Sequence, residues 1–175
     1  MTKLSKTAKI FLFLLASSTV IWLGNSISRM FFTYNIFQSP DLVLKPFLSE
    51  NTLKLIFVIH QPMVSISIFA YFAMIAFLIL FIITSHLKLR ENGWLFISLI
   101  LVFITAPFEI FLIVKDFDLL MSLFYTDYDL THVMKIILQR YSVMGSFIIL
   151  EVLAYFAVIF LFILQPLTKK FSNET

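Results

Sequence analysis

The chain has 175 residues, of which 61% are hydrophobic and only 13% are charged, and its formal net charge is +3. A soluble globular domain has about 25% charged residues, so this composition excludes a water-soluble fold and indicates a membrane-embedded protein. The absence of cysteine excludes disulfides, thiolate metal sites, iron–sulfur clusters and c-type haem attachment. The basic residues are dispersed along the chain, so the net charge does not indicate nucleic-acid binding.

The first apolar run covers about residues 10–32, which is long enough to span a bilayer. Its basic flank also resembles the start of a secretory signal peptide, but no clear cleavage site follows the apolar core, so we expect the segment to be retained. As a helix it places Asn25 and Arg29 on one face, beside Gly24 and Ser28 at the small-residue spacing of helix contacts. This face is therefore predicted to pack against another helix.

Residues 33–61 are mixed in character and are expected to lie outside the bilayer. Within them, residues 49–60 have helical spacing of apolar side chains, which predicts an amphipathic helix in the membrane interface, a cap on the bundle or a partly ordered loop. A second span is predicted at 62–85, with Pro62 at the helix start, where its missing backbone N–H costs little. This span contains Tyr71 but no charged residue.

The third predicted span, residues 94–114, carries an acid within the membrane region. Its polar residues recur at helical spacing and form one stripe, which consists of Ser98, Thr105, Glu109 and Asp116. Because a carboxylate in lipid is costly, the stripe is expected to face protein or water. Pro107 is predicted to kink the helix beside Glu109, since its ring clashes with a preceding carbonyl.

The remaining segments complete a bundle of four transmembrane helices. Residues 86–93 return the chain so quickly that the second and third spans are predicted to be antiparallel neighbours. Residues 115–140 are interpreted as a second amphipathic outer segment, and the last span is predicted at 143–164, with Glu151 inside it. The sequence thus predicts an all-α polytopic membrane protein, with residues 1–175 forming a single membrane-embedded domain.

The distribution of basic residues predicts the orientation of the bundle. If the N-terminus is cytoplasmic, the inner segments hold seven basic and two acidic residues, whereas the outer segments hold six of each. Short inner segments of membrane proteins are enriched in Lys and Arg. Both termini are therefore predicted to be cytoplasmic, with residues 33–61 and 115–140 outside.

The predicted ligand or proton site lies in the outer half of the bundle. With a rise of about 1.5 Å per residue, Glu109 lies about 9 Å and Glu151 about 15 Å below the outer interface. Tyr71 falls at a depth similar to that of Glu151, and Arg29 lies near the outer end of its helix. Together with Thr105, these residues are expected to form one polar cluster.

This cluster has a structural and a functional interpretation. In the structural one, Arg29 neutralises Glu109, and Glu151 is protonated because burial disfavours a charged carboxyl group. In the functional one, the intramembrane acids form a proton or ligand site. The sequence predicts an Arg29–Glu109 ion pair, since neither charge has another strong partner of opposite sign at its depth.

The histidines and loop acids give weaker signals for a cofactor. His60 and His86 lie at opposite ends of one span, and His60 and His132 could meet outside it, but neither is convincingly placed for haem b. Asp127, Asp129 and His132 could bind a cation, although solvated loop charges and helix capping by Asp129 explain the pattern more simply. We expect no cofactor and no metal.

The sequence leaves two functions open. It contains no GxSxG, HExxH or phosphate-binding glycine motif, so it favours a protein that is not an enzyme. The first hypothesis is an accessory subunit that contacts a membrane protein, or a second copy of itself, through the Gly24/Ser28 face or the outer segments. The alternative is a proton-coupled carrier or membrane enzyme that uses Glu109 and Glu151 with Arg29. The bilayer is an expected partner and nucleic acid is not.

Overall fold

The computed structural model describes residues 4–38, 42–124 and 128–168. Over these residues the chain forms four long helices and a pair of two-residue strands. These are α1 (Lys6–Ile36), β1 (Phe37–Gln38), β2 (Val43–Leu44), α2 (Glu50–Ser85), α3 (Gly93–Leu123) and α4 (Leu130–Leu164). The predicted all-α fold is confirmed, and each helix contains a stretch long and apolar enough to cross a membrane.

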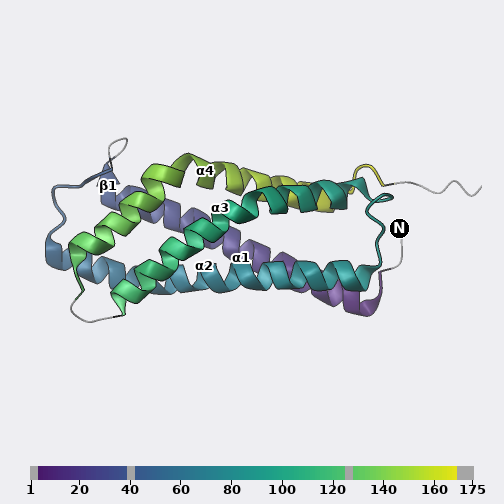
Figure 1. The fold of residues 1–175 in the computed structure, drawn as a ribbon, viewed down its shortest axis with the longest axis horizontal. Helices are drawn as coiled ribbons and strands as arrows, with labels where there is room; N and C mark the ends of the chain where they lie inside the picture. The colour runs from purple at the N-terminus through teal and green to yellow at the C-terminus, as the bar shows by residue number, and fades with distance from the viewer. Residues whose placement is uncertain (1–3, 39–41, 125–127, 169–175) are drawn as a thin grey trace, which may run out of the picture.

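The helices run side by side along the long axis of the molecule (Figure 1). The α1–α2 and α3–α4 connections lie at one end, here called the connection end, and the α2–α3 turn lies at the opposite end, here called the termini end. Helix α1 packs mainly on α2, and α3 packs mainly on α4, whereas α1 and α4 touch only sparsely. The bundle is therefore two helix pairs joined along a less extensive seam.

Three of the four long helices, α1, α2 and α4, begin at a side-chain N-cap. The side chains of Ser5, Ser49 and Asp129 accept hydrogen bonds from backbone N–H groups in the first turns of α1, α2 and α4. Such N-caps satisfy donors that have no partner within the helix. Capping by Asp129 confirms the simpler interpretation of that loop acid. His86 and Gln165 adopt left-handed conformations where α2 and α4 end.

The helices extend beyond the predicted spans, and the prediction of separate amphipathic outer segments is wrong. Residues 49–60 form the first turns of α2, which continues through Pro62, and residues 115–140 contribute to the ends of α3 and α4. The physical reason is packing, because Leu53, Leu119 and Val133 from these segments belong to one buried cluster. Their apolar faces pack against neighbouring helices, so within the described residues these segments continue the long helices instead of forming separate interfacial ones. Proline is tolerated inside long apolar helices when neighbouring groups satisfy the freed carbonyl.

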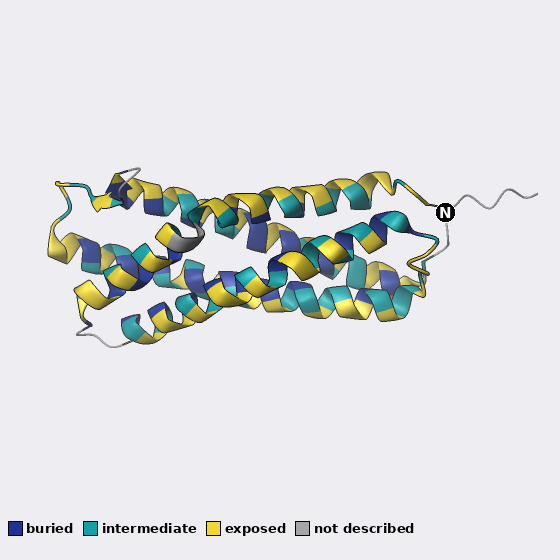
Figure 2. Ribbon diagram, turned by 45° about the horizontal axis from the view of Figure 1, so that its top comes forward, coloured by how far each residue is buried: buried dark blue, intermediate teal, exposed yellow. Residues whose placement is uncertain are grey.

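The outward surface is apolar, as a lipid environment requires. Figure 2 shows exposed residues along the outward faces of the helices and buried residues toward the interior. Phe13, Phe69 and Phe103 are 69%, 76% and 80% exposed. Exposed apolar surface this extensive is rare in soluble monomers. The fold and its surface thus agree with a membrane-spanning bundle.

Candidate functional site

All five residues predicted for the polar site are buried inside the bundle, with at most 5% of each exposed: Arg29, Tyr71, Thr105, Glu109 and Glu151. The α3 stripe that contains Glu109 faces the interior along its whole length, as predicted, because its other members are buried too. The four helices each contribute to the site, since Arg29 comes from α1, Tyr71 from α2 and Glu151 from α4. The structure thus brings the predicted residues into one region.

An ion cluster of Arg29, Asp116 and Arg140 joins three helices. The Nη1 and Nη2 atoms of Arg29 donate to the two carboxylate oxygens of Asp116 at 2.8 and 2.6 Å. Arg140 Nη1 donates to Oδ1 of the same carboxylate at 2.7 Å. Parallel hydrogen bonds between a guanidinium and a carboxylate are among the strongest polar contacts in proteins. Asp116 is therefore the common acceptor for both buried arginines.

The predicted Arg29–Glu109 ion pair is wrong. Helix α3 continues to Leu123, so Asp116 lies inside the bundle instead of in an outer loop. Two turns beyond Glu109 on the same stripe, it offers Arg29 both carboxylate oxygens. Glu109 instead accepts a hydrogen bond from Trp22 Nε1 at 2.9 Å.

Glu109 and Glu151 form a carboxyl pair between α3 and α4. Both side chains are buried and line the same small cavity, and neither makes an ion pair within the described part of the chain. Two ionised carboxylates in contact repel each other strongly in a low-dielectric interior, and one retained proton relieves that repulsion. The net charge of these groups would be zero if both arginines and Asp116 are ionised and the carboxyl pair holds one proton. One proton on the pair would therefore balance the buried charges of the site.

Aromatic side chains surround the carboxyl pair. The ring centroid of Trp22 lies 4.5 Å from that of Tyr155 and 6.0 Å from that of Tyr71. The hydroxyls of Tyr71 and Tyr155 are buried and make no hydrogen bond to the described residues, and the same holds for Oε1 of Glu151. Buried polar atoms normally have a partner. These three groups supply unused hydrogen-bonding capacity beside the pair.

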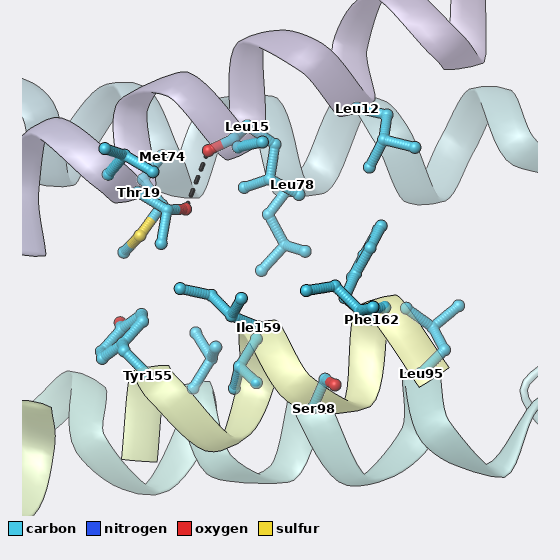
Figure 3. Close-up of a pocket in the computed structure, with 15 residues that line it drawn as sticks. Leu12, Leu15, Thr19, Met74, Leu78, Leu95, Ser98, Tyr155, Ile159 and Phe162 are labelled. Carbon is cyan, nitrogen blue, oxygen red and sulfur yellow. Dashed lines mark hydrogen bonds between the residues drawn. The ribbon is translucent and has the colours of Figure 1, made fainter. Parts of the chain in front are cut away.

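The space beside the acids is very small. A cavity of about 10 Å³ touches Glu109, Glu151 and both arginines, and this is about the volume that one water needs. A much larger cavity of about 290 Å³ lies between the two helix pairs and is lined by residues of all four helices. Tyr155 lines this larger cavity (Figure 3), and its ring also packs against that of Trp22. The structure thus separates a water-sized polar space from a larger apolar one.

The histidines do not form a common site. His60 is buried and stacks on Phe32, with ring centroids 4.2 Å apart, whereas His132 is exposed. Asp127 lies outside the described residues. Over residues 4–38, 42–124 and 128–168, no group of three or more His, Cys, Asp or Glu side chains is arranged to hold a metal ion.

The sequence contained signals for the residues that were missed. Arg140 lies eleven residues before Glu151, which places both on one face of a continuous helix. Trp22 lies seven residues before Arg29, and this spacing also returns to the same helical face. The relationship between Arg140 and Glu151 is hidden when residues 115–140 are interpreted as an outer segment. The relationship between Trp22 and Arg29 is hidden when only the charged and small residues of α1 are considered.

Comparisons of the chain with protein-family models, curated proteins and solved structures gave no match. The class of the protein is therefore defined by its own sequence and structure. It is an all-α bundle whose four long helices have the length and composition of membrane spans, with an ion cluster and a carboxyl pair buried between them.

Proposed function

We propose that the protein is a proton-coupled membrane carrier in which Glu109 and Glu151 hold one exchangeable proton. The observation that carries this proposal is the division of the buried charges. Arg29 and Arg140 both bind Asp116, so neither makes an ion pair with the two glutamates. An intramembrane acid without a cationic partner is costly unless it binds a proton. The lack of an ion pair between Glu109 and either arginine favours a bound proton over neutralisation by Arg29 as the role of this acid.

The position of the carboxyl pair supports coupling to a conformational change. Glu109 on α3 is hydrogen-bonded to Trp22 on α1, so it lies at the seam between the two helix pairs. Loss of the shared proton would place two negative charges at this seam and weaken the packing around it. Many carriers work by movement of one helical bundle against another around a central site. The sparse contact between α1 and α4 favours such movement.

Fluorescence of Trp22 provides a direct test of proton binding. In a Trp94→Phe background, Trp22 is the remaining tryptophan and reports on Glu109, to which it donates. The proposal expects a pH-dependent change in Trp22 emission in detergent and in vesicles. Glu109→Gln and Glu151→Gln should each abolish or shift this change, because either substitution removes one member of the pair.

A matched control is Asp118→Asn, which removes an exposed acid from the same helix. This variant should titrate like the parent. A pH-independent Trp22 signal, or a titration that persists unchanged in both glutamine variants, would contradict the proposal. Infrared difference spectroscopy of the protonated carboxyl band provides a second measurement that does not depend on tryptophan.

The accessory-subunit function remains a second candidate because of one observation on α1. Apart from the two neighbouring residues and the adjoining backbone of α1, no described atom lies within 4 Å of the position that a Cβ on Gly24 would occupy. Ser28 is exposed, and its hydroxyl donates to the Gly24 carbonyl. Small residues at this spacing let a second helix approach closely. A photoreactive residue at Ser28 should then yield one cross-linked protein of defined mass in native membranes, and one at exposed Phe69 should not. Lipid adducts alone at both positions would contradict this function.

A further inference from the structure

We propose that the large cavity between the two helix pairs is a binding site for a hydrocarbon chain of a membrane lipid. This inference is independent of the proposed proton chemistry, because the cavity and the carboxyl pair are separate spaces. The cavity volume is about 290 Å³. An apolar cavity of about 150 Å³ stays dry and takes up benzene, so this space has room for a chain of several methylene groups.

The lining of the cavity selects an apolar ligand. Leucine, methionine, valine and phenylalanine side chains from all four helices surround it (Figure 3). Two hydroxyls in the lining are already used, since Thr19 donates to the Leu15 carbonyl and Ser98 donates to the Trp94 carbonyl, each at 2.8 Å. Neither of these two hydroxyls has its proton free for water or a polar headgroup, and the third hydroxyl in the lining, that of Tyr155, is buried without a hydrogen-bond partner among the described residues. Because the rest of the lining is apolar, a hydrocarbon is the occupant that it fits.

The cavity opens toward the place where lipid chains lie. Two of its lining residues, Val20 on α1 and Ile163 on α4, are 63% and 74% exposed. The opening therefore lies between the two helices that touch only sparsely. Both belong to helices that qualify as membrane spans, so acyl chains are the molecules beside the opening. A chain that enters from the side would fill a space that close-packed protein interiors normally do not leave.

Tyr155 connects the cavity to the carboxyl pair through Trp22. In Figure 3 it closes one end of the cavity, opposite Leu95 and Phe162. The same ring lies 4.5 Å from Trp22, whose indole binds Glu109. A chain that reaches the end of the cavity would contact Tyr155, so the occupant would lie two side chains away from the carboxyl pair.

Photolabelling of the full-length protein in phosphatidylcholine vesicles tests the site. One arm uses phosphatidylcholine with a diazirine at the end of one acyl chain, and the other uses free palmitate with the same group. Labelled residues are mapped by mass spectrometry. The proposal expects label on Met74 and Tyr155, which line the cavity and are only 2% exposed. Label from one arm alone would identify whether the chain belongs to a phospholipid or to a free acid.

A cavity-filling variant, Ala16→Phe, should lose the label on Met74 and Tyr155, because Ala16 lines the cavity. Its matched control is Ile21→Phe, which adds an aromatic ring to an exposed α1 residue outside the lining and should keep the label. Label confined to outward residues such as Phe13 in the wild-type protein would overturn the proposal. That result needs no variant, so the test holds even if Ala16→Phe fails to fold.

Discussion

Arg29 and Asp116 form a two-point ion pair across 87 residues of sequence, with nitrogen–oxygen distances of 2.8 and 2.6 Å. Arg140 shares the same carboxylate, so one acid connects α1, α3 and α4. Burial makes this arrangement sensitive to the loss of any member, because a charge left alone in the interior has neither water nor a counter-ion. The ion cluster therefore stabilises the relative positions of the two helix pairs.

Asp116→Asn should destabilise the protein more than Arg29→Met does. Loss of Asp116 leaves two buried cations without their acceptor, whereas loss of Arg29 leaves Asp116 bound to Arg140. Breaking a buried pair by removing one partner costs about 3–5 kcal/mol. Thermal unfolding in detergent measures the difference. The double variant Arg29→Met, Asp116→Asn should be less destabilised than the sum of the single variants, and strictly additive losses would contradict the coupling.

Trp22→Phe should cost more than Trp94→Phe. Trp22 Nε1 donates to Glu109, so its removal leaves a buried acceptor without that bond, at a cost of about 1–3 kcal/mol. Trp94 is equally buried, but its Nε1 has no hydrogen-bond partner among the described residues. The two substitutions remove similar side-chain volume, but only Trp22→Phe also removes a side-chain hydrogen bond. Equal losses of thermal stability would show that the Trp22–Glu109 hydrogen bond contributes little.

The sequence predicted the parts of the fold that depend on hydropathy and helical period. The α3 stripe from Ser98 to Asp116 is buried as its spacing predicted, since a period of 3.6 residues determines which side chains share a face. The partner of Arg29 could not be chosen in the same way. Glu109 and Asp116 share that stripe, and only the continuation of α3 to Leu123 places Asp116 within reach of Arg29.

Helix ends were harder to predict because tertiary packing determines them. Residues 49–60 and 115–140 carry enough polar residues to resemble loops, yet their apolar faces are buried against one another at the connection end. Arg140 was assigned to an outer segment for this reason. The apolar cavity could not be predicted either, since it depends on how far α1 lies from α4, and no local pattern encodes that distance.

Tyr128→Phe should loosen the connection end. The Tyr128 hydroxyl donates to the Lys54 carbonyl at 2.8 Å and so links the α3–α4 connection to α2. Its loss should cost about 0.5–1.5 kcal/mol. Burial raises the pKa of Tyr128 above its ordinary value of 10.0, so the stabilisation is present below that value and is lost as pH rises through the raised pKa. Thermal unfolding from neutral to alkaline pH should show a decline in the wild type that Tyr128→Phe reduces.

Gly93→Ala and Gly145→Ala should have opposite effects on stability. A Cβ at Gly93 would lie 2.9 Å from the Cβ of Leu167, and the Gly93 N–H donates to the Leu167 carbonyl, so the added methyl would disturb this contact. At Gly145, inside α4, the new Cβ would meet no described atom within 4 Å beyond the adjoining turns of its own helix. Alanine is preferred to glycine in a helix by about 1 kcal/mol. Paired thermal unfolding curves should move down for Gly93→Ala and up for Gly145→Ala.

Reporter fusions at Asn92 and Ser172 should both give a cytoplasmic signal. The α2–α3 turn and the end of α4 lie at the same end of the bundle, so the two positions are expected on one side of the membrane (Figure 1). The excess of basic residues on the short segments at this end predicts that the side is the cytoplasm. A third fusion at Val43, in the α1–α2 connection, should give the opposite signal. Different signals at Asn92 and Ser172 would contradict the four spans, whereas non-cytoplasmic signals at both would leave the spans intact and reverse the predicted orientation.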